Sequence, residues 1–314
     1  MSKSSSSAAE GRPRIILLCG PTAVGKTALA VTLAKRYPLE IISADSRQVY
    51  RGMNIGTAKP TEVEREGVPH HLLDVVDPAE EFSVADFIRL ADRAAAEIQT
   101  RGRIPLVVGG TGLYWQLLTE GLMSSPGADP ELRQALEGLD NREGDGALYR
   151  LLQERDPVAA QAIPPGNRVR IVRALEVISQ TGQAFSRLQR EHGFSDRPYR
   201  VLKIGLFMDR QELYQRIDDR VVAMMRQGLE AEVRNLLDSG LGNAKAMKTI
   251  GYREMVGVLR GGSDREKALG LIQRNSRRYA KRQLTWMRRD KTMIWLDSST
   301  EFVKICKLIE NFIA

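Results

Sequence analysis

The sequence predicts an α/β protein in which a parallel sheet is flanked by helices and interrupted by an all-helical insertion. The first observation is an apolar run over residues 15–19, which leads through a glycine loop into a helical pattern over residues 28–34. The second is that further apolar runs alternate with helical patterns. The third is that this alternation stops between about residues 122 and 200. The expected organisation is a disordered tail over 1–13, a sheet domain over 14–121 and 201–314, and a helical domain over 122–200.

The loop after the first strand has the form Gly-x-x-x-x-Gly-Lys-Thr, the phosphate-binding loop of P-loop NTPases. Its glycines let successive backbone N–H groups face an anion, and the following helix adds its dipole. Lys26 supplies a mobile positive charge, and the Thr27 hydroxyl is a ligand for Mg²⁺. The loop alone leaves open whether a nucleoside triphosphate or another diphosphate binds. The expected anion-binding residues are Gly20, Pro21, Thr22, Ala23, Val24, Gly25, Lys26 and Thr27.

The composition fits a soluble globular protein of a reducing compartment. The 314 residues are 42% hydrophobic and 27% charged, with a formal net charge of +8, which permits a polyanionic partner without requiring one. Cys19 and Cys306 lie far apart in apolar runs, which indicates buried thiols and argues against a disulfide framework or a metal site. The Ser-rich N-terminus has no apolar segment of a secretory signal, and no stretch reaches transmembrane length, so we expect a cytosolic protein.

Polar residues follow the second expected strand, residues 39–44, at the sheet edge where the phosphate loop lies. Asp45 is placed there to act on a substrate beside bound phosphates. An N-cap or loop turn explains an Asp at this position equally well, so both interpretations stay open. A long loop is expected over residues 52–69, which are rich in Gly, Pro, Thr and charge.

Residues 70–76 are the next strand candidate and begin with two histidines. His70 and His71 would point to opposite faces of a strand, and no cysteine or third histidine lies nearby, which argues against a metal site. Ser83 and Asp86 form the pattern of a capping box for the helix that follows.

The strand expected over residues 104–108 ends in Gly109, Gly110 and Thr111 and then enters a helix. Many phosphate-loop ATPases carry an acidic residue at such a strand end to hold Mg²⁺ and position water. The glycines instead permit a substrate to approach the backbone closely, and Thr111 offers a hydrogen bond. A tight strand-to-helix turn explains these residues equally well. The missing acid argues against a motor or hydrolytic NTPase.

The insertion contains helical patterns over residues 129–137, 147–155 and 167–180, separated by turns. Arginines crowd the start of the third helix, where they could meet phosphates. A solvated basic face is the more common use of such arginines and is the default interpretation without other evidence.

Residues 201–208 return to a strand pattern, followed by one long helix over 210–237. Arg216, Arg220 and Arg226 lie along this helix, and an arginine there could close over transferring phosphates. A surface ion pair with a nearby carboxylate is the alternative for each of them.

The helix expected over residues 265–289 has the clearest signal for a polyanion. Four of its basic residues recur at helical spacing and form a stripe on one face, with Tyr279 and Trp286 nearby, a pattern that suits RNA phosphates and unstacked bases. The residues of this stripe are Arg274, Arg278, Lys281 and Arg288. A helix whose charges serve only solubility is the alternative, but the excess is too one-sided for a balanced salt-bridge face. A basic connection over 246–253 precedes this helix, and a strand over 293–296 and a helix over 301–313 follow it. The basic residues are Arg274, Arg277, Arg278, Lys281, Arg282, Arg288 and Arg289.

Five motifs stand out: Gly-Pro-Thr-Ala-Val-Gly-Lys-Thr from residue 20, Ser-Ala-Asp-Ser-Arg-Gln-Val-Tyr from 43, Met-Asn-Ile-Gly-Thr-Ala-Lys-Pro from 53, Gly-Gly-Thr-Gly-Leu-Tyr from 109 and Lys-Arg-Gln-Leu-Thr-Trp from 281. Together they resemble the tRNA dimethylallyltransferase family, also called tRNA isopentenyltransferases. The resemblance runs from about Arg14 to near the C-terminus. It implies transfer of a dimethylallyl group from its diphosphate to N6 of adenine 37, next to the anticodon, in tRNAs that read codons beginning with U.

By this resemblance the phosphate loop holds the pyrophosphate of the donor and not ATP, with Lys26 and Mg²⁺ on Thr27 neutralising the leaving group. Arg220 matches the arginine that braces the pyrophosphate, Asp45 the acid that takes the N6 proton, and Thr111 a residue at the adenine pocket. The adenine would leave the stacked loop to reach them. The residues expected along the tRNA are Asp45, Ser46, Arg47, Gln48, Thr111, Arg133, Asn167, Arg168, Val169, Arg170, Ile171, Met247, Lys248, Gly251, Tyr252, Arg278, Lys281, Arg282, Gln283, Trp286 and Arg288.

The resemblance implies Mg²⁺ as cofactor, dimethylallyl diphosphate and the tRNA anticodon stem-loop as substrates, a monomer, and no membrane partner. Two rival functions use the same phosphate loop. A prenyltransferase for free AMP, ADP or ATP would need the loop and the acid but has little use for the helical insertion and the basic helix. A phosphate-loop kinase or ATPase would instead bind ATP and transfer or hydrolyse its phosphate.

Overall fold

The computed structural model describes residues 11–194 and 196–314. The chain forms two compact units, one made of the segments up to Thr119 and from Pro198, the other of Glu120–Arg197. The helical unit thus starts two residues and ends three residues before the limits expected from the sequence, 122 and 200. Of the tail expected over residues 1–13, the first ten residues lie outside the described part of the chain.

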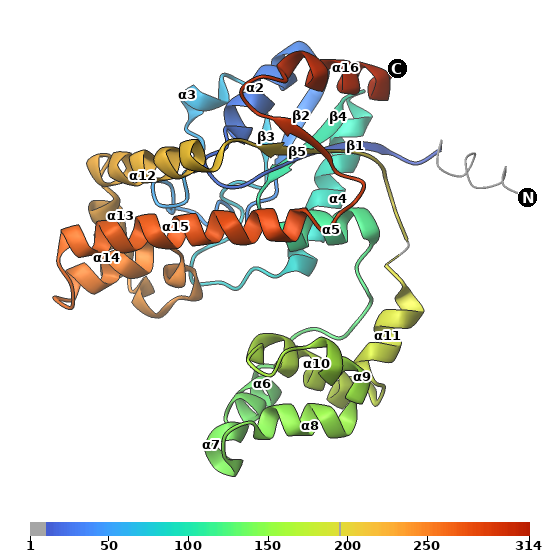
Figure 1. Cartoon of the computed structure of the whole chain (residues 1–314), viewed down its shortest axis with the longest axis vertical. Helices are drawn as coiled ribbons and strands as arrows, with labels where there is room; N and C mark the ends of the chain where they lie inside the picture. The colour runs from blue at the N-terminus through green and yellow to red at the C-terminus, as the bar shows by residue number, and fades with distance from the viewer. Residues whose placement is uncertain (1–10, 195) are drawn as a thin grey trace, which may run out of the picture. The chain divides into compact units, whose positions relative to one another are not determined.

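The larger unit is built on one parallel sheet, six strands wide within the described residues, in the order β3-β2-β4-β1-β5-β6 (Figure 1). Strand β1 lies near the centre, between β4 on one side and β5 on the other. Its carboxyl end therefore delivers the phosphate loop to the middle of the sheet edge. The strands are β1 (Arg14–Cys19), β2 (Leu39–Ser43), β3 (His70–His71), β4 (Ile104–Gly109), β5 (Arg200–Phe207) and β6 (Ile294–Asp297).

Side chains alternate across β1, so each face of the sheet buries its own apolar cluster. Ile16 and Leu18 pack with residues of α2, α12 and α16, whereas Ile15 and Leu17 pack with residues of α4 and α5. A third cluster joins α12, α13, α14 and α15 to residues between Val49 and Val76. The helices of this unit are α2 (Lys26–Arg36), α3 (Glu62–Arg65), α4 (Val84–Thr100), α5 (Gly112–Glu120), α12 (Arg210–Arg226), α13 (Leu229–Asp238), α14 (Tyr252–Leu259), α15 (Arg265–Met287) and α16 (Phe302–Ile313), with 3-10 turns η1 (Leu241–Asn243) and η2 (Lys245–Lys248).

The helical unit has a hydrophobic core of its own, in which Leu148 and Leu152 pack with Ile171 and Leu175. The three helices expected from the sequence are present, and three short ones that it did not indicate, α7, α9 and α11, complete the unit. Its helices are α6 (Pro130–Glu137), α7 (Leu139–Glu143), α8 (Ala147–Arg155), α9 (Pro157–Ala162), α10 (Arg168–Thr181) and α11 (Phe185–His192).

Four expectations about local structure were wrong. The long loop expected over residues 52–69 contains the short helix α3. The strand over residues 70–76 is limited to β3, because Leu72 and Asp74 adopt left-handed φ angles of 65° and 56° that end the extended chain. The helix over 210–237 is two helices, since Gly228 breaks it with a φ of 99°. The connection over 246–253 contains η2 and the start of α14.

Candidate functional site

The phosphate loop has the backbone geometry of an anion cradle. Gly25 adopts a φ of 95°, which an L side chain rarely tolerates, and it directly precedes α2. Glycine has no side chain to cap this helix, so the N–H groups of its first turn stay available to a ligand. A Cβ at Gly20 would lie 2.9 Å from Val24 and 3.0 Å from the Leu206 carbonyl oxygen. The glycines of the motif are therefore required by the turn itself.

Lys26, the first residue of α2, bends back over the phosphate loop. Its Nζ donates hydrogen bonds to the carbonyl oxygens of Gly20 at 2.9 Å and Pro21 at 2.7 Å. Burial lowers the pKa of Lys26 to about 8, while Asp45 raises this pKa and Arg220 lowers it further. A cation desolvated in this way gains stability from any anion that enters the loop.

One cavity of about 790 Å³ brings the predicted chemical groups together. Its walls come from the phosphate loop, the segments after β2 and β4, the loop before α3, and helices α12 and α15. The predicted residues along it are Thr22, Ala23, Gly25, Lys26, Thr27, Asp45, Ser46, Arg47, Gln48, Arg220, Lys248, Gly251, Arg282 and Gln283. Segments up to about 260 residues apart in sequence thus share one chamber.

Arg220 enters this cavity from α12. Burial lowers the pKa of Arg220, and the negative charges of Asp45 and Glu64 oppose that shift. Among the described residues, neither Arg220 nor Lys26 forms an ion pair, whereas Arg216 on the same helix pairs with Glu212 at 2.9 Å. The sequence offered Arg216, Arg220 and Arg226 as candidates on this helix. Of these three, Arg220 lines the cavity, and Arg226 lines a separate, more open pocket.

Asp45 and Thr111 occupy neighbouring strand ends, as the sequence indicated. Asp45 Oδ1 accepts a hydrogen bond from the Arg47 backbone N–H at 2.8 Å, which fixes the carboxylate at the start of the segment. Thr111 Oγ1 accepts one from the Ser46 N–H at 3.1 Å. The turn interpretation and the substrate interpretation of Asp45 are compatible, because the same carboxylate caps the turn and lines the cavity. The cavity therefore places the Asp45 carboxylate in the same chamber as the two desolvated cations Lys26 and Arg220.

Comparisons with known proteins agree on one family. A family model described as IPP transferase matches residues 48–290, and one described as isopentenyl transferase matches residues 13–77. The chain is 54% identical to tRNA dimethylallyltransferase 1 of Syntrophotalea carbinolica over 303 residues, which cover 96% of each protein. The chain belongs to the tRNA dimethylallyltransferase family.

Two solved structures support this assignment. The full-length tRNA isopentenylpyrophosphate transferase of Bacillus halodurans is 43% identical, with a TM-score of 0.71, and the match covers 96% of this chain and 97% of that one. A eukaryotic dimethylallyltransferase described as acting on tRNA is 29% identical, with a TM-score of 0.81, over 92% of this chain and 74% of that one. The resemblance inferred from the motifs is confirmed, and the chain is an enzyme of the prenyltransferase class.

The surface of α15 on which tRNA contacts are predicted is basic and exposed. The exposed basic residues on α15 and directly after it include Arg278, Lys281, Arg282 and Arg288. The Arg282 guanidinium lies over the Tyr279 ring at 5.7 Å from its centre. These side chains are free to meet a polyanion in the way that the sequence predicted.

One predicted tRNA contact on α15, Gln283, and one further basic residue of this helix, Arg277, form bonds within the protein. Gln283 is buried; its Oε1 accepts from the Thr22 N–H at 2.9 Å and its Nε2 donates to the Gly110 carbonyl at 3.0 Å. Arg277, another basic residue of this helix, forms an ion pair with Asp218 on α12. Gln283 therefore ties the phosphate loop to the strand end that carries Thr111.

Several residues expected along the tRNA have buried side chains. Met247 and Tyr252 are 3% and 0% exposed, and the Tyr252 hydroxyl donates to Glu232. In the helical unit, Ile171 is 1% exposed, whereas Val169 is 82% exposed. The side chains of Met247, Tyr252 and Ile171 thus belong to hydrophobic cores.

The remaining predicted residues of the helical unit lie near the start of α10 or pair with carboxylates. Asn167 caps α10, accepting from the Arg170 N–H at 3.4 Å, and Arg168 forms an ion pair with Asp140. Arg133 donates to both oxygens of Glu176, at 2.8 Å and 3.0 Å. The start of this helix is thus basic and exposed, while Arg133 is committed to a buried carboxylate.

The donor set at the phosphate loop fits the Mg²⁺ that the family resemblance implies. Thr27 lines the cavity directly after Lys26. A hydroxyl and phosphate oxygens are the hard ligands that Mg²⁺ prefers, and this ion usually keeps substrate phosphates among its ligands. Among the described residues, no cluster of three or more His, Cys, Asp or Glu could hold a metal.

The sequence reasoning did not assign a role to the loop before α3. Gly56, Thr57, Ala58 and Pro60 line the cavity, although the motif from residue 53 served only as a mark of the family. The signal was present in the odd composition of this motif, which places a lysine between small residues.

Within the described residues, no helix is both long and apolar enough to cross a membrane.

Proposed function

We propose that this enzyme transfers the dimethylallyl group of dimethylallyl diphosphate to N6 of adenine 37 in tRNAs that read codons beginning with U. The observation that carries the proposal is the single cavity in which the phosphate loop, Asp45 and Arg220 meet. The two desolvated cations, Lys26 and Arg220, would bind a diphosphate. The Asp45 carboxylate would accept a proton from the attacking nucleophile. We also propose that the enzyme acts as a monomer in the cytoplasm, where its tRNA substrate is found.

The cations Lys26 and Arg220 would bind the diphosphate from opposite sides. As N6 attacks the first carbon of the dimethylallyl group, the bond from that carbon to the diphosphate oxygen breaks and negative charge grows on the leaving group. Both cations are already desolvated, so they stabilise this growing charge without reorganisation. Mg²⁺, held by Thr27 and the diphosphate, would supply further positive charge to the leaving group.

Asp45 would accept the proton that N6 loses. The amine becomes strongly acidic only as the new C–N bond forms, so a carboxylate is basic enough. The hydrogen bond from the Arg47 N–H holds Asp45 at the cavity wall near the phosphate loop. The bond formed is C–N, the bond broken is C–O, and the proton passes from nitrogen to the carboxylate.

The tRNA would lie along the exposed basic residues of α15 and the start of α10. Both are rich in arginine and lie at helix surfaces open to solvent. Salt-dependent contacts to phosphates would hold the stem-loop, while the adenine leaves its stack to enter the cavity.

The test is incubation of the purified protein with bulk tRNA and labelled dimethylallyl diphosphate, without ATP, followed by digestion to nucleosides. We expect label in an N6-modified adenosine. Label in free AMP, ADP or ATP but not in tRNA would indicate an adenylate prenyltransferase, and hydrolysis of ATP without any prenyl transfer would indicate a phosphate-loop ATPase.

A further inference from the structure

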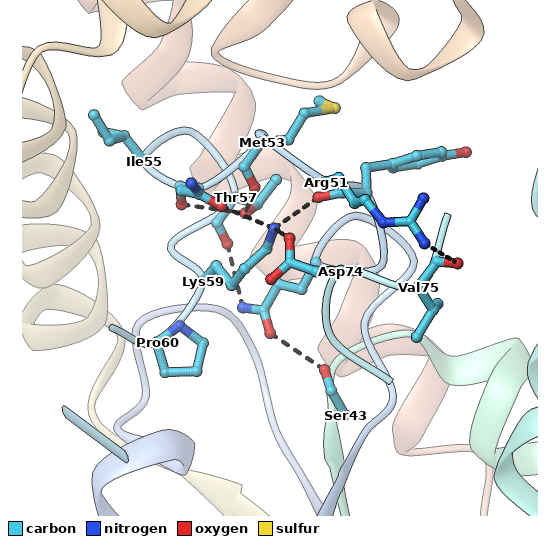
Figure 2. Close-up of polar contacts among 12 residues, drawn as sticks. Ser43, Arg51, Met53, Ile55, Thr57, Lys59, Pro60, Asp74 and Val75 are labelled. Carbon is cyan, nitrogen blue, oxygen red and sulfur yellow. Dashed lines mark hydrogen bonds and ion pairs between the residues drawn. The ribbon is translucent and has the colours of Figure 1, made fainter. Parts of the chain in front are cut away.

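A buried lysine lies directly behind the wall of the cavity. Lys59 is 7% exposed, and it sits between Ala58 and Pro60, which both line the cavity. Its side chain turns inward, away from solvent, and Figure 2 shows it pointing at Asp74. Lysine is among the residues that are almost never fully buried unless paired, so this burial calls for a reason.

Lys59 connects two segments of the chain through three hydrogen bonds. Its Nζ donates to the Tyr50 carbonyl oxygen at 2.6 Å, to Asn54 Oδ1 at 2.9 Å and to Asp74 Oδ1 at 2.5 Å. The three N–H bonds of one ammonium group match these three acceptors in number. The ammonium thus fixes the loop of residues 50–60 to the segment that follows β3.

The same loop orients a side chain of the cavity. Gln48 Nε2 donates to the carbonyl oxygens of Ala58 at 3.0 Å and Thr57 at 3.4 Å, which belong to the two consecutive peptides before Lys59. Gln48 Oε1 accepts from Ser43 Oγ at 3.2 Å. Because both N–H bonds of the carboxamide are engaged by the loop, its orientation depends on where the loop lies.

Backbone strain occurs at both ends of this network. Ala58 and Asp74 adopt left-handed φ angles of 49° and 56°, which residues with a side chain rarely adopt. Such conformations persist only where the surroundings hold them in place. From the other side, the Glu232 carboxylate accepts the backbone N–H groups of residues 54, 55 and 56, at 2.9, 2.8 and 3.1 Å.

We propose that Lys59 is a positioning residue for prenyl transfer, which acts through the loop of residues 50–60 to orient Gln48 beside Asp45. Lys59 itself does not line the cavity. Its ammonium group holds the loop, and thereby the Thr57 and Ala58 carbonyls that orient the Gln48 carboxamide. The inference rests on the proposed function, because its readout is the transfer reaction. Gln48 follows Asp45, which the proposed function assigns to the acceptor, in the same segment after β2, so the inference predicts an effect on the acceptor and not on the donor.

The test compares three variants of the full chain. Lys59→Met keeps the length and removes the ammonium. Asp74→Asn is milder, since it keeps an oxygen acceptor and removes one charge. Lys304→Met is the matched control, because Lys304 pairs with Glu301 at 3.0 Å on the exposed surface of α16, away from the cavity.

Initial rates are measured with tRNA and dimethylallyl diphosphate varied in turn, alongside thermal melting. We expect Lys59→Met to lower kcat/KM for tRNA by about 10- to 100-fold, as small misplacements in active sites do, with KM for dimethylallyl diphosphate within about twofold of wild type. Asp74→Asn should give a smaller loss of the same kind, and Lys304→Met none. A rise in KM for dimethylallyl diphosphate as large as the loss in kcat/KM for tRNA would overturn the inference. A normal kcat/KM for tRNA in Lys59→Met would overturn it as well.

A double-mutant cycle with Gln48→Ala tests the route. If Lys59 acts through Gln48, adding Lys59→Met to Gln48→Ala lowers kcat/KM for tRNA by less than about threefold further, because coupled residues are not additive. A full additional loss would contradict the route. If Lys59→Met does not fold, Asp74→Asn takes its place in the cycle. Wild-type protein that transfers no prenyl group would instead contradict the proposed function.

Discussion

In the helical unit, Glu176 is fully buried between Arg133 and Arg173, and both arginines bond its carboxylate. In the α/β unit, Lys26 and Arg220 border the cavity without an ion pair among the described residues. The first arrangement is complete within the protein, whereas the second leaves two desolvated cations whose counter-charge must come from elsewhere. Buried charges that lack a partner thus mark the ligand site, and paired ones mark the fold.

The largest expected effect concerns the carboxylate of the cavity. Asp45→Ala should lower the turnover of tRNA by about 10³-fold, the range of a lost general base, since Asp45 is the carboxylate proposed to accept the N6 proton. Steady-state kinetics measure the loss, and KM for dimethylallyl diphosphate should change little. Unchanged turnover would remove Asp45 from this role and leave it only the turn.

Next in size is the change at the carboxylate of the helical unit. Glu176→Gln should destabilise that unit by about 3 kcal/mol, because it leaves two arginines beside an uncharged amide in a buried place. Hydrogen exchange at the amides of α6 and α10 reports this stability. Donor binding, measured on the same protein, should stay normal; a loss of donor binding would break the distinction between paired and unpaired charges.

The pH dependence of the same unit follows from Glu176. Burial raises the pKa of Glu176, but hydrogen bonds from Arg133, from the Asp129 amide and from Arg173 outweigh it and hold this pKa below its ordinary value. Since the folded state binds the proton more weakly, the stabilisation is present above pH 4.5 and is lost as the pH falls through the lowered pKa. Hydrogen exchange should show this loss in wild type and a flatter profile in Glu176→Gln.

Arg220→Met tests the opposite arrangement. We expect a loss of about 10²-fold in kcat, as for the removal of one group that stabilises a developing anion. The melting temperature should stay the same or rise, because the change removes a desolvated cation that has no carboxylate partner in the described structure. A fall in melting temperature comparable to that of Glu176→Gln would show that Arg220 serves the fold.

The smallest effect is expected on the surface of α15. Replacing Arg278 and Arg282 by Ala should weaken tRNA binding and lower the slope of log affinity against log salt by about one for each lost phosphate contact. Filter binding at several salt concentrations measures this slope. Replacing the paired Arg277 alone should instead lower stability, and an unchanged slope in the double variant would make the stripe a solvated surface.

Much of the fold and the chemical core of the site could be predicted because the signals are local. The phosphate loop needs only the order of glycine, lysine and threonine between a strand and a helix, and these eight residues fold as expected. Asp45 and Thr111 follow strands of a parallel sheet, so their meeting at one edge follows from the fold class. The family motifs added the reaction, which the residues alone left open.

What the sequence by itself determined is therefore the set of elements and the groups that meet at the sheet edge. The tertiary structure decided which charged and polar side chains are already satisfied. Arg277 meets Asp218, Gln283 meets Thr22 far away in the chain, and Lys59 meets Asp74 behind the cavity wall. Desolvation and pairing depend on distances between segments remote in sequence, and a linear pattern of residue types does not contain those distances.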